Sequence, residues 1–203
     1  MEIIYKKYYP SLPAEEKLLI DLQKSILTLH YSQEIQMAED FLHDYLQQIK
    51  EADVYTENQL LVINLFFHCH TFEVFDLRIF KLIIPKLLQQ AKDVQGISGS
   101  LIIQLLLNAI SILDQEVDYS LYLKVLEAAY QLMERLEEYN KKPIFLMMEG
   151  KYWLRGRGNR AKGEIFYQHA IQLAKLFGNS DLALKIDQER HQDIERCDLL
   201  LIG

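Results

Sequence analysis

Residues 99–115, GSLIIQLLLNAISILDQ, determine the fold class of this 203-residue chain. Apolar side chains fill most positions of this stretch. Its uncharged polar residues are spaced by four, four, three and four positions: Ser100, Gln104, Asn108, Ser111 and Gln115. Residues three and four apart share one side of an α-helix, so these five trace a narrow polar face. The stretch therefore predicts a long, largely buried helix with one polar stripe.

The composition favours helices in the rest of the chain as well. Glycine (8) and proline (4) are scarce, which argues against a β-sandwich or barrel, because such folds need a turn every ~8–12 residues. Apolar residues make up 50% and charged residues 25% of the chain, as expected for a domain with a sizeable core. The formal net charge of −7 argues against direct nucleic-acid binding by these residues.

Helical periodicity recurs along the whole chain. It predicts helices over residues 14–31, 33–52, 57–72, 77–94, 99–115, 119–139, 143–157, 160–177 and 181–197. Thr56 to Gln59 form a predicted capping box. Further start and stop signals are Pro143 and Gly178, and the predicted N-caps Ser32, Asp76, Ser98, Asp118, Asn159 and Ser180. Pro85 lies inside the helix 77–94 and predicts a kink there, because proline removes a backbone hydrogen bond.

Alternate predicted helices begin at a nearly constant interval. Those starting near 14, 57, 99, 143 and 181 are 43, 42, 44 and 38 residues apart, close to the period of a helix-hairpin repeat. The series Leu154-x3-Gly158-x4-Gly163-x3-Tyr167-x2-Ala170 is a degenerate tetratricopeptide spacing, in which a small residue faces a large aromatic one. We therefore predict an all-α fold, a right-handed α-solenoid of about four to five tetratricopeptide-like hairpins, in preference to a globular bundle. Residues 1–13 are predicted to be an N-terminal linker segment and residues 14–203 the helical-repeat domain.

Motifs of catalysis and of cofactor binding are missing from the sequence. It contains no P-loop, Rossmann glycine motif, nucleophile elbow or zinc-ligand pattern, so we expect no enzyme activity, cofactor or metal. His68-Cys69-His70 is the densest cluster of potential ligands, but on a helix residues 68 and 70 point about 200° apart. Two cysteines, Cys69 and Cys197, favour a reducing cytoplasm over a disulfide framework. Neither a signal peptide nor an uninterrupted apolar run of 18 residues occurs, so no membrane association is expected.

Uncharged polar residues recur on the first helices of successive hairpins, which line the concave surface of such a solenoid. The predicted helix 57–72 carries Asn64, His68 and Thr71 at the same helical spacing as the stripe on 99–115. Side-chain amides offer a donor and an acceptor, which match an extended peptide backbone. The pattern predicts a peptide-binding groove formed by Asn64, His68, Gln104, Asn108, Ser111, Glu149, Tyr152 and Arg155. The alternative is that these residues link buried helices to one another or face water.

The end of the chain resembles a known family. Residues 149–156 (EGKYWLRG), 170–178 (AIQLAKLFG) and 181–183 (DLA) resemble the C-terminal domain of the Rgg/GadR/MutR family of transcriptional regulators. The resemblance implies a cytoplasmic, homodimeric regulatory domain that binds a short apolar signalling peptide in quorum sensing. It implies that Asn64 and Asn108 contact the peptide backbone, as asparagines do in the wider group of peptide-sensing regulators. Family members carry an N-terminal helix-turn-helix domain that is absent from this chain, so DNA contact is expected only through such a domain.

Taken together, the pattern and the resemblance predict the ligand-sensing and dimerisation domain of a transcriptional regulator. The alternative is a constitutive tetratricopeptide-like scaffold for protein–protein interaction, without a response to peptide. A third possibility is a purely structural role through dimerisation, to which the apolar tail 197–202 contributes surface.

Overall fold

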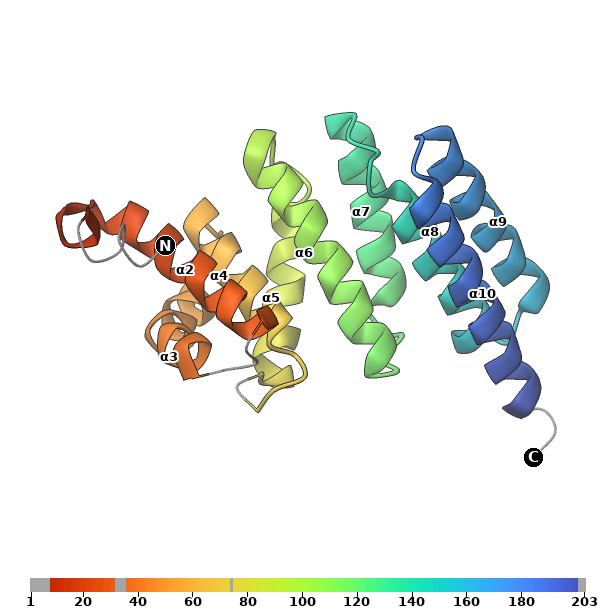
Figure 1. The fold of residues 1–203 in the computed structure, drawn as a ribbon, viewed down its shortest axis with the longest axis horizontal. Helices are drawn as coiled ribbons and strands as arrows, with labels where there is room; N and C mark the ends of the chain where they lie inside the picture. Colours follow the sequence, from red (N-terminus) through yellow and green to blue (C-terminus); the bar gives the residue numbers. More distant parts are fainter. Residues whose placement is uncertain (1–7, 32–35, 74, 201–203) are drawn as a thin grey trace. The chain divides into compact units, whose positions relative to one another are not determined.

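The computed structural model describes residues 8–31, 36–73 and 75–200, and the regular structure within these ranges is entirely helical (Figure 1). In chain order the elements are η1 (Tyr9–Ser11), α2 (Ala14–Tyr31), α3 (Gln36–Glu51), α4 (Glu57–His68), α5 (Leu77–Gln90), α6 (Gly96–Gln115), α7 (Tyr122–Leu136), α8 (Lys142–Lys151), η2 (Tyr152–Gly156), α9 (Arg160–Leu176) and α10 (Ser180–Leu200). Each predicted helix is present, and the prediction of an all-helical chain is confirmed for these ranges.

Three start signals read from the sequence are confirmed. Thr56 caps α4 in a complete capping box: its hydroxyl accepts from the Gln59 backbone, and the Gln59 side chain accepts from the Thr56 backbone. Asp76 caps α5 by accepting from the Arg78 backbone N–H, and Asn159 caps α9 in the same manner. These caps satisfy N–H groups that have no partner inside the helix.

Three other predicted N-caps are wrong. Ser98 lies inside α6, because that helix already begins at Gly96. Asp118 accepts from the Ser120 backbone in a local turn, and α7 begins only at Tyr122. Ser180 is the first residue of α10, whose cap is Asn179, since the Asn179 side chain accepts from the Leu182 backbone. The predicted cap Ser32 lies outside the described residues.

The stop and break signals have mixed outcomes. Gly178 follows α9 with a φ of +74°, the left-handed conformation that glycine adopts without strain. Pro143 stands in the first turn of α8, as predicted. The predicted helix 143–157 is divided, because its last turn, η2, is a π-helix. Pro85 lies inside α5, which continues on both sides of it.

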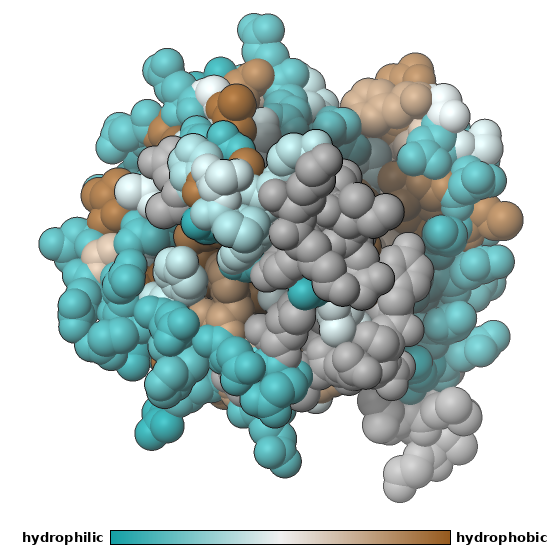
Figure 2. All heavy atoms as spheres, turned by 60° about the vertical axis from the view of Figure 1, so that its left-hand side comes forward, coloured by the Kyte–Doolittle hydropathy of each residue, from teal (hydrophilic) through white to brown (hydrophobic). Residues whose placement is uncertain are grey.

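The chain divides into two compact units, Met1–Asn108 and Ala109–Gly203, called here the N-terminal and the C-terminal unit. In the N-terminal unit α2 packs against α3 and α4, and α3 also contacts α5. Its buried core is mostly leucine and isoleucine, with an aromatic cluster: the rings of Phe66 and Phe75 stack at 4.9 Å, and those of Phe67 and Phe80 lie 5.2 Å apart. Hydrophilic side chains cover much of the face shown in Figure 2, with apolar side chains exposed in separate places.

In the C-terminal unit α9 packs against both α8 and α10. A Cβ atom added to Gly150 would lie 2.8 Å from Cδ2 of Tyr167, and one added to Gly163 would lie 2.9 Å from Cβ of Leu154. Both distances are too short for a side chain, so the two glycines allow α8 and η2 to approach α9 closely. Gly163 and Tyr167 therefore act as the tetratricopeptide spacing predicts, with a small residue at the contact and a buried aromatic ring one turn later.

Among the described helices, α6 alone is long and apolar enough to cross a membrane by length and composition. Half of its most apolar 18-residue window is buried inside the protein. Ile102, Ile103 and Leu106 are fully buried. This burial agrees with the prediction that α6 is a largely buried helix with one polar stripe.

Candidate functional site

Three of the predicted site residues meet in the N-terminal unit. The Nδ2 atom of Asn108 on α6 donates to Oδ1 of Asn64 on α4 at 2.9 Å. One turn earlier on α6, Nε2 of Gln104 donates to Oδ1 of Asn108, also at 2.9 Å. All three side chains are half-buried. We call Asn64, Gln104 and Asn108 the amide cluster.

The amide cluster retains hydrogen-bonding capacity. Its two bonds run in one direction, from Gln104 through Asn108 to Asn64. Within the described residues, neither Oε1 of Gln104 nor Nδ2 of Asn64 takes part in a further hydrogen bond. An acceptor at one end and a donor at the other are the groups that a peptide backbone complements.

His68 lies one turn after Asn64 on α4 and is half-buried. Its neighbour Cys69 is fully buried, and Nδ1 of His70 lies 3.2 Å from the backbone oxygen of Phe67. In the described part of the chain, no group of three His, Cys, Asp or Glu residues is placed to hold a metal ion.

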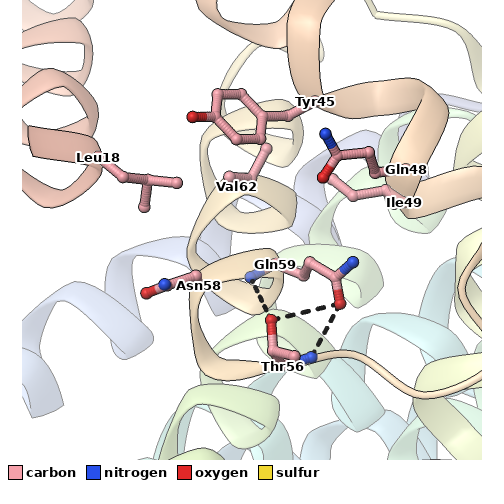
Figure 3. A pocket seen from close by; sticks show the side chains of 8 residues that line it. All are labelled: Leu18, Tyr45, Gln48, Ile49, Thr56, Asn58, Gln59 and Val62. Atoms are coloured by element: carbon pink, nitrogen blue, oxygen red, sulfur yellow. Dashed lines mark hydrogen bonds between the residues drawn. The ribbon is translucent and has the colours of Figure 1, made fainter. Parts of the chain in front are cut away.

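The N-terminal unit also holds a pocket of about 220 Å³ between α2, α3 and the start of α4 (Figure 3). None of the predicted site residues lines it. Its lining consists of Leu18, Tyr45, Gln48, Ile49, Thr56, Asn58, Gln59 and Val62. Figure 3 shows that Thr56 and Gln59 are joined to each other by the capping-box hydrogen bonds. These two polar residues of the pocket lining therefore cap the start of α4.

In the C-terminal unit, Arg155 on η2 belongs to a cluster of buried and half-buried charges. Its Nη1 atom lies 2.8 Å from Oδ2 of Asp114 and 3.9 Å from Oδ1 of Asp193. Lys151 lies 2.6 Å from Glu189 and 3.7 Å from Asp193. The Asp193 side chain is completely buried and accepts a 2.6 Å hydrogen bond from the Tyr167 hydroxyl.

Burial shifts the pKa of two groups here, the Asp114 carboxyl and the Tyr167 hydroxyl. It raises the pKa of the Asp114 carboxyl above its ordinary value, although the positive charges of Arg155 and Lys151 act in the opposite direction. Burial, reinforced by the hydrogen bond to Asp193, also raises the pKa of the Tyr167 hydroxyl. The phenol of Tyr167 is therefore a neutral donor to a buried carboxylate.

Ser111 lines a pocket of about 290 Å³ next to this charge cluster. The pocket lies between the end of α6, the length of α8 and the first half of α10. Its lining residues are Ser111, Asp114, Gln115, Ile144, Met147, Met148, Lys151, Leu182, Lys185, Ile186 and Glu189. Arg155 does not line this pocket, but it forms an ion pair with Asp114, which does.

The last two predicted site residues lie elsewhere in the C-terminal unit. Tyr152 is fully buried, and its ring stacks on that of Tyr122 at 5.4 Å. Glu149 accepts hydrogen bonds from the Tyr130 hydroxyl at 2.9 Å and from Nε1 of Trp153 at 3.4 Å. Neither residue lines the pocket that contains Ser111.

Sequence reasoning missed Asp114 and Asp193, which shape this part of the C-terminal unit. Asp114 is the single charged residue of the apolar stretch 99–115. A lone charge in a helix predicted to be buried could have marked it as a site residue. Asp193 lies among other charged residues of a polar helix, where nothing local distinguishes a buried carboxylate from an exposed one.

Comparison with known proteins identifies relatives of this architecture. The family model described as ComR tetratricopeptide matches residues 1–190. No curated protein matches the chain.

Several solved structures share the fold. ComR from Streptococcus vestibularis in complex with its cognate signalling peptide XIP has a TM-score of 0.80 and 26% identity, over 95% of this chain and 84% of that one. ComR from S. thermophilus in complex with DNA and its signalling peptide ComS also has a TM-score of 0.80 and 26% identity, over 95% and 66%. The apo form of the S. vestibularis regulator gives 0.78 and 25%, over 95% and 64%. The present chain thus spans about two thirds of the latter two proteins, and the predicted tetratricopeptide-like fold is confirmed.

Proposed function

The chain belongs to the ComR tetratricopeptide family, and from that premise we propose that it is the ligand-sensing domain of a transcriptional regulator that binds a short signalling peptide. The similarity to a ComR complex with XIP and to one with ComS supports peptide as the ligand. The relatives are regulators, so we expect binding rather than catalysis.

The observation that carries this proposal is the amide cluster. Its three side chains form a directional hydrogen-bonded row that leaves an acceptor on Gln104 and a donor on Asn64. A peptide strand offers N–H and C=O groups at regular intervals, so it can extend such a row at both ends. Backbone contacts of this kind give affinity for extended peptides irrespective of their side chains. His68, one turn from Asn64, is the nearest further candidate along α4.

Several wider properties belong to the same proposal. We infer membership of the broader Rgg/GadR/MutR group, a homodimeric assembly and a cytoplasmic location, and we treat residues 14–203 as the regulatory domain after a linker at 1–13. DNA contact is assigned to a helix-turn-helix domain outside these residues. Light scattering tests the homodimer, and the same measurement after truncation at Arg196 tests whether the apolar tail contributes to it.

Isothermal titration with short apolar peptides, XIP and ComS among them, tests peptide binding. We expect at least one peptide to bind the wild type, and Asn64→Ala and Asn108→Ala each to weaken that binding. Gln131→Ala is a matched control, because the Gln131 amide lies exposed on α7 and bonds only to Glu127 in the described structure. Absence of binding by every peptide would refute the function. Unchanged affinity of both asparagine variants would refute the role of the amide cluster alone.

A further inference from the structure

The pocket between α2, α3 and the start of α4 (Figure 3) combines buried aliphatic side chains with uncharged polar ones. Of its aliphatic residues, Ile49 and Val62 are buried and Leu18 is half-buried. None of the described residues that line the pocket carries a charge. A ligand that fits this lining is therefore neutral, because a charged group would lose hydration here without gaining an ionic partner.

Three polar side chains of this pocket are available to a ligand. Within the described residues, neither the Tyr45 hydroxyl nor the side-chain amides of Gln48 and Asn58 take part in a hydrogen bond. Tyr45 and Asn58 are half-buried, and Gln48 is exposed. In the view of Figure 3 the two amides lie on opposite sides of Val62. A small ligand placed over Val62 can therefore meet an amide at each of two edges.

The volume of the pocket limits the size of this ligand. About 220 Å³ lies below the ~300–1,000 Å³ that is typical of pockets for drug-sized ligands. An extended peptide of several residues needs more room, whereas a single small ring does not. The ring of Tyr45 stacks on that of Phe41 at 4.8 Å, which fixes one wall of the pocket.

The two free amides select the chemistry of the ring. A side-chain amide presents an N–H donor and a C=O acceptor on one edge, so it pairs best with an amide whose own N–H and C=O lie on the same side. Peptide bonds of an extended chain are almost always trans, and their N–H and C=O groups point in opposite directions. An amide inside a six-membered ring is held cis and offers both groups together. Gln48 and Asn58 therefore favour a ring with cis amides over an extended peptide.

We propose that this pocket binds a small neutral ring that carries cis amides, and that Gln48 and Asn58 pair with its amide edges. Two sources share this chemistry: cyclic dipeptides, with one such amide on each side of the ring, and pyrimidinediones such as uracil. The site is separate from the amide cluster, since none of Asn64, Gln104 and Asn108 lines the pocket. The inference therefore adds a second ligand site and does not rest on the proposed function.

Two-dimensional ¹H–¹⁵N NMR of the complete chain tests the proposal through the side-chain NH₂ signals. The probes are two matched pairs, cyclic diglycine with its N,N′-dimethyl derivative and uracil with 1,3-dimethyluracil. We expect the signals of Gln48 and Asn58 to shift, while that of Gln47 does not, because the exposed Gln47 amide bonds to Glu51 outside the pocket. At least one probe with N–H groups should bind about tenfold more tightly than its methylated partner, since methylation removes its donors. The pair with the larger ratio identifies the source of the ring.

Variants locate the binding within the pocket. Gln48→Ala and Asn58→Ala should each lower the affinity of the preferred probe about fivefold, as expected for the loss of a neutral hydrogen bond. Leu18→Trp should abolish the shifts by filling the pocket, and Gln47→Ala, the matched control, should change neither. Unchanged affinity of both amide variants would overturn the proposal. Equal binding within both pairs by the wild type, no binding of any probe, or shifts that spare Gln48 and Asn58 would overturn it without recourse to a variant.

The variants of the amide cluster separate this inference from the proposed function. Asn64→Ala and Asn108→Ala should leave the affinity of the probes unchanged, because neither residue lines the pocket. Loss of probe binding in either variant would refute a separate site. Probe binding by a chain that binds no peptide would leave this pocket assigned and the peptide function refuted.

Discussion

The side chain of Asn108 donates a 2.9 Å hydrogen bond to the side chain of Asn64, which precedes it by 44 residues. That separation is one period of the predicted helix-hairpin repeat. The bond therefore joins equivalent turns of α4 and α6, the first helices of two successive hairpins. Because both residues are half-buried, the bond links α4 to α6 where solvent is partly excluded.

A double-mutant cycle measures this link. Asn64→Ala, Asn108→Ala and the double variant should show a coupling of about 0.5–1.5 kcal/mol in the free energy of unfolding, the usual net value of one hydrogen bond. Urea denaturation provides the measurement. Gln131→Ala combined with Asn108→Ala should be additive, because these amides do not share a bond. Strict additivity of the Asn64 and Asn108 variants would contradict the geometry.

Gly150→Ala should destabilise the protein by about 1–3 kcal/mol, the cost typical of overpacking. The added Cβ would meet the ring of buried Tyr167 at 2.8 Å and the backbone oxygen of Gly163 at 3.2 Å. Helix propensity alone would stabilise the alanine variant by about 1 kcal/mol. A loss of stability would therefore show that the packing cost exceeds the gain in helix propensity. Thermal denaturation of the variant, with Gln168→Ala as an exposed control on α9, decides between them. A more stable Gly150→Ala would show that α8 and α9 do not pack this closely.

Tyr167→Phe should cost about 1.5–3 kcal/mol, because it removes the hydroxyl that donates to the buried Asp193 carboxylate. The ring, and hence most of the packing, is retained. Tyr139→Phe is the matched control, since Tyr139 is 37% exposed. Guanidinium denaturation at neutral pH should separate the two variants, and equal stabilities would refute an energetic role for this hydrogen bond.

Alkaline pH should destabilise the protein partly through Cys69. Burial, followed by the negative charge of Glu39, raises the pKa of this thiol from 9.0 to about 12. The folded state therefore holds the thiol proton where the unfolded state releases it, so the free energy of unfolding falls as pH rises from about 9 to 12. Burial raises the pKa of Tyr55 from 10.0 to about 12, which adds to the slope above pH 10.

Urea denaturation at a series of alkaline pH values checks this expectation. Cys69→Ala should reduce the slope of stability against pH above 9, and Tyr55→Phe should reduce it only above 10. Slopes identical to that of the wild type would contradict the assignment, whatever the absolute stabilities of the variants.

Local sequence signals predicted the helices well and some of their boundaries poorly. Thr56 was a reliable cap because its reciprocal partner Gln59 lies three residues later, so the complete motif is local. Ser98 and Asp118 failed as caps because several polar residues compete near each helix start, and packing selects among them. The division of 143–157 into α8 and η2 had no local signal, since a π-turn depends on the contacts around it.

By itself, the sequence determined an all-helical chain with a repeat near 43 residues, and it assigned Asn64 and Asn108 to one predicted groove. Those features follow from periodicity, because the helix fixes which residues share a face and the repeat aligns equivalent faces. Only the tertiary structure decided that Asp114 meets Arg155, 41 residues later, and that Asp193 is buried beside Lys151. Such contacts depend on the rotation of each helix about its axis and on the space between helices, and neither quantity is encoded in the local pattern of apolar and polar residues.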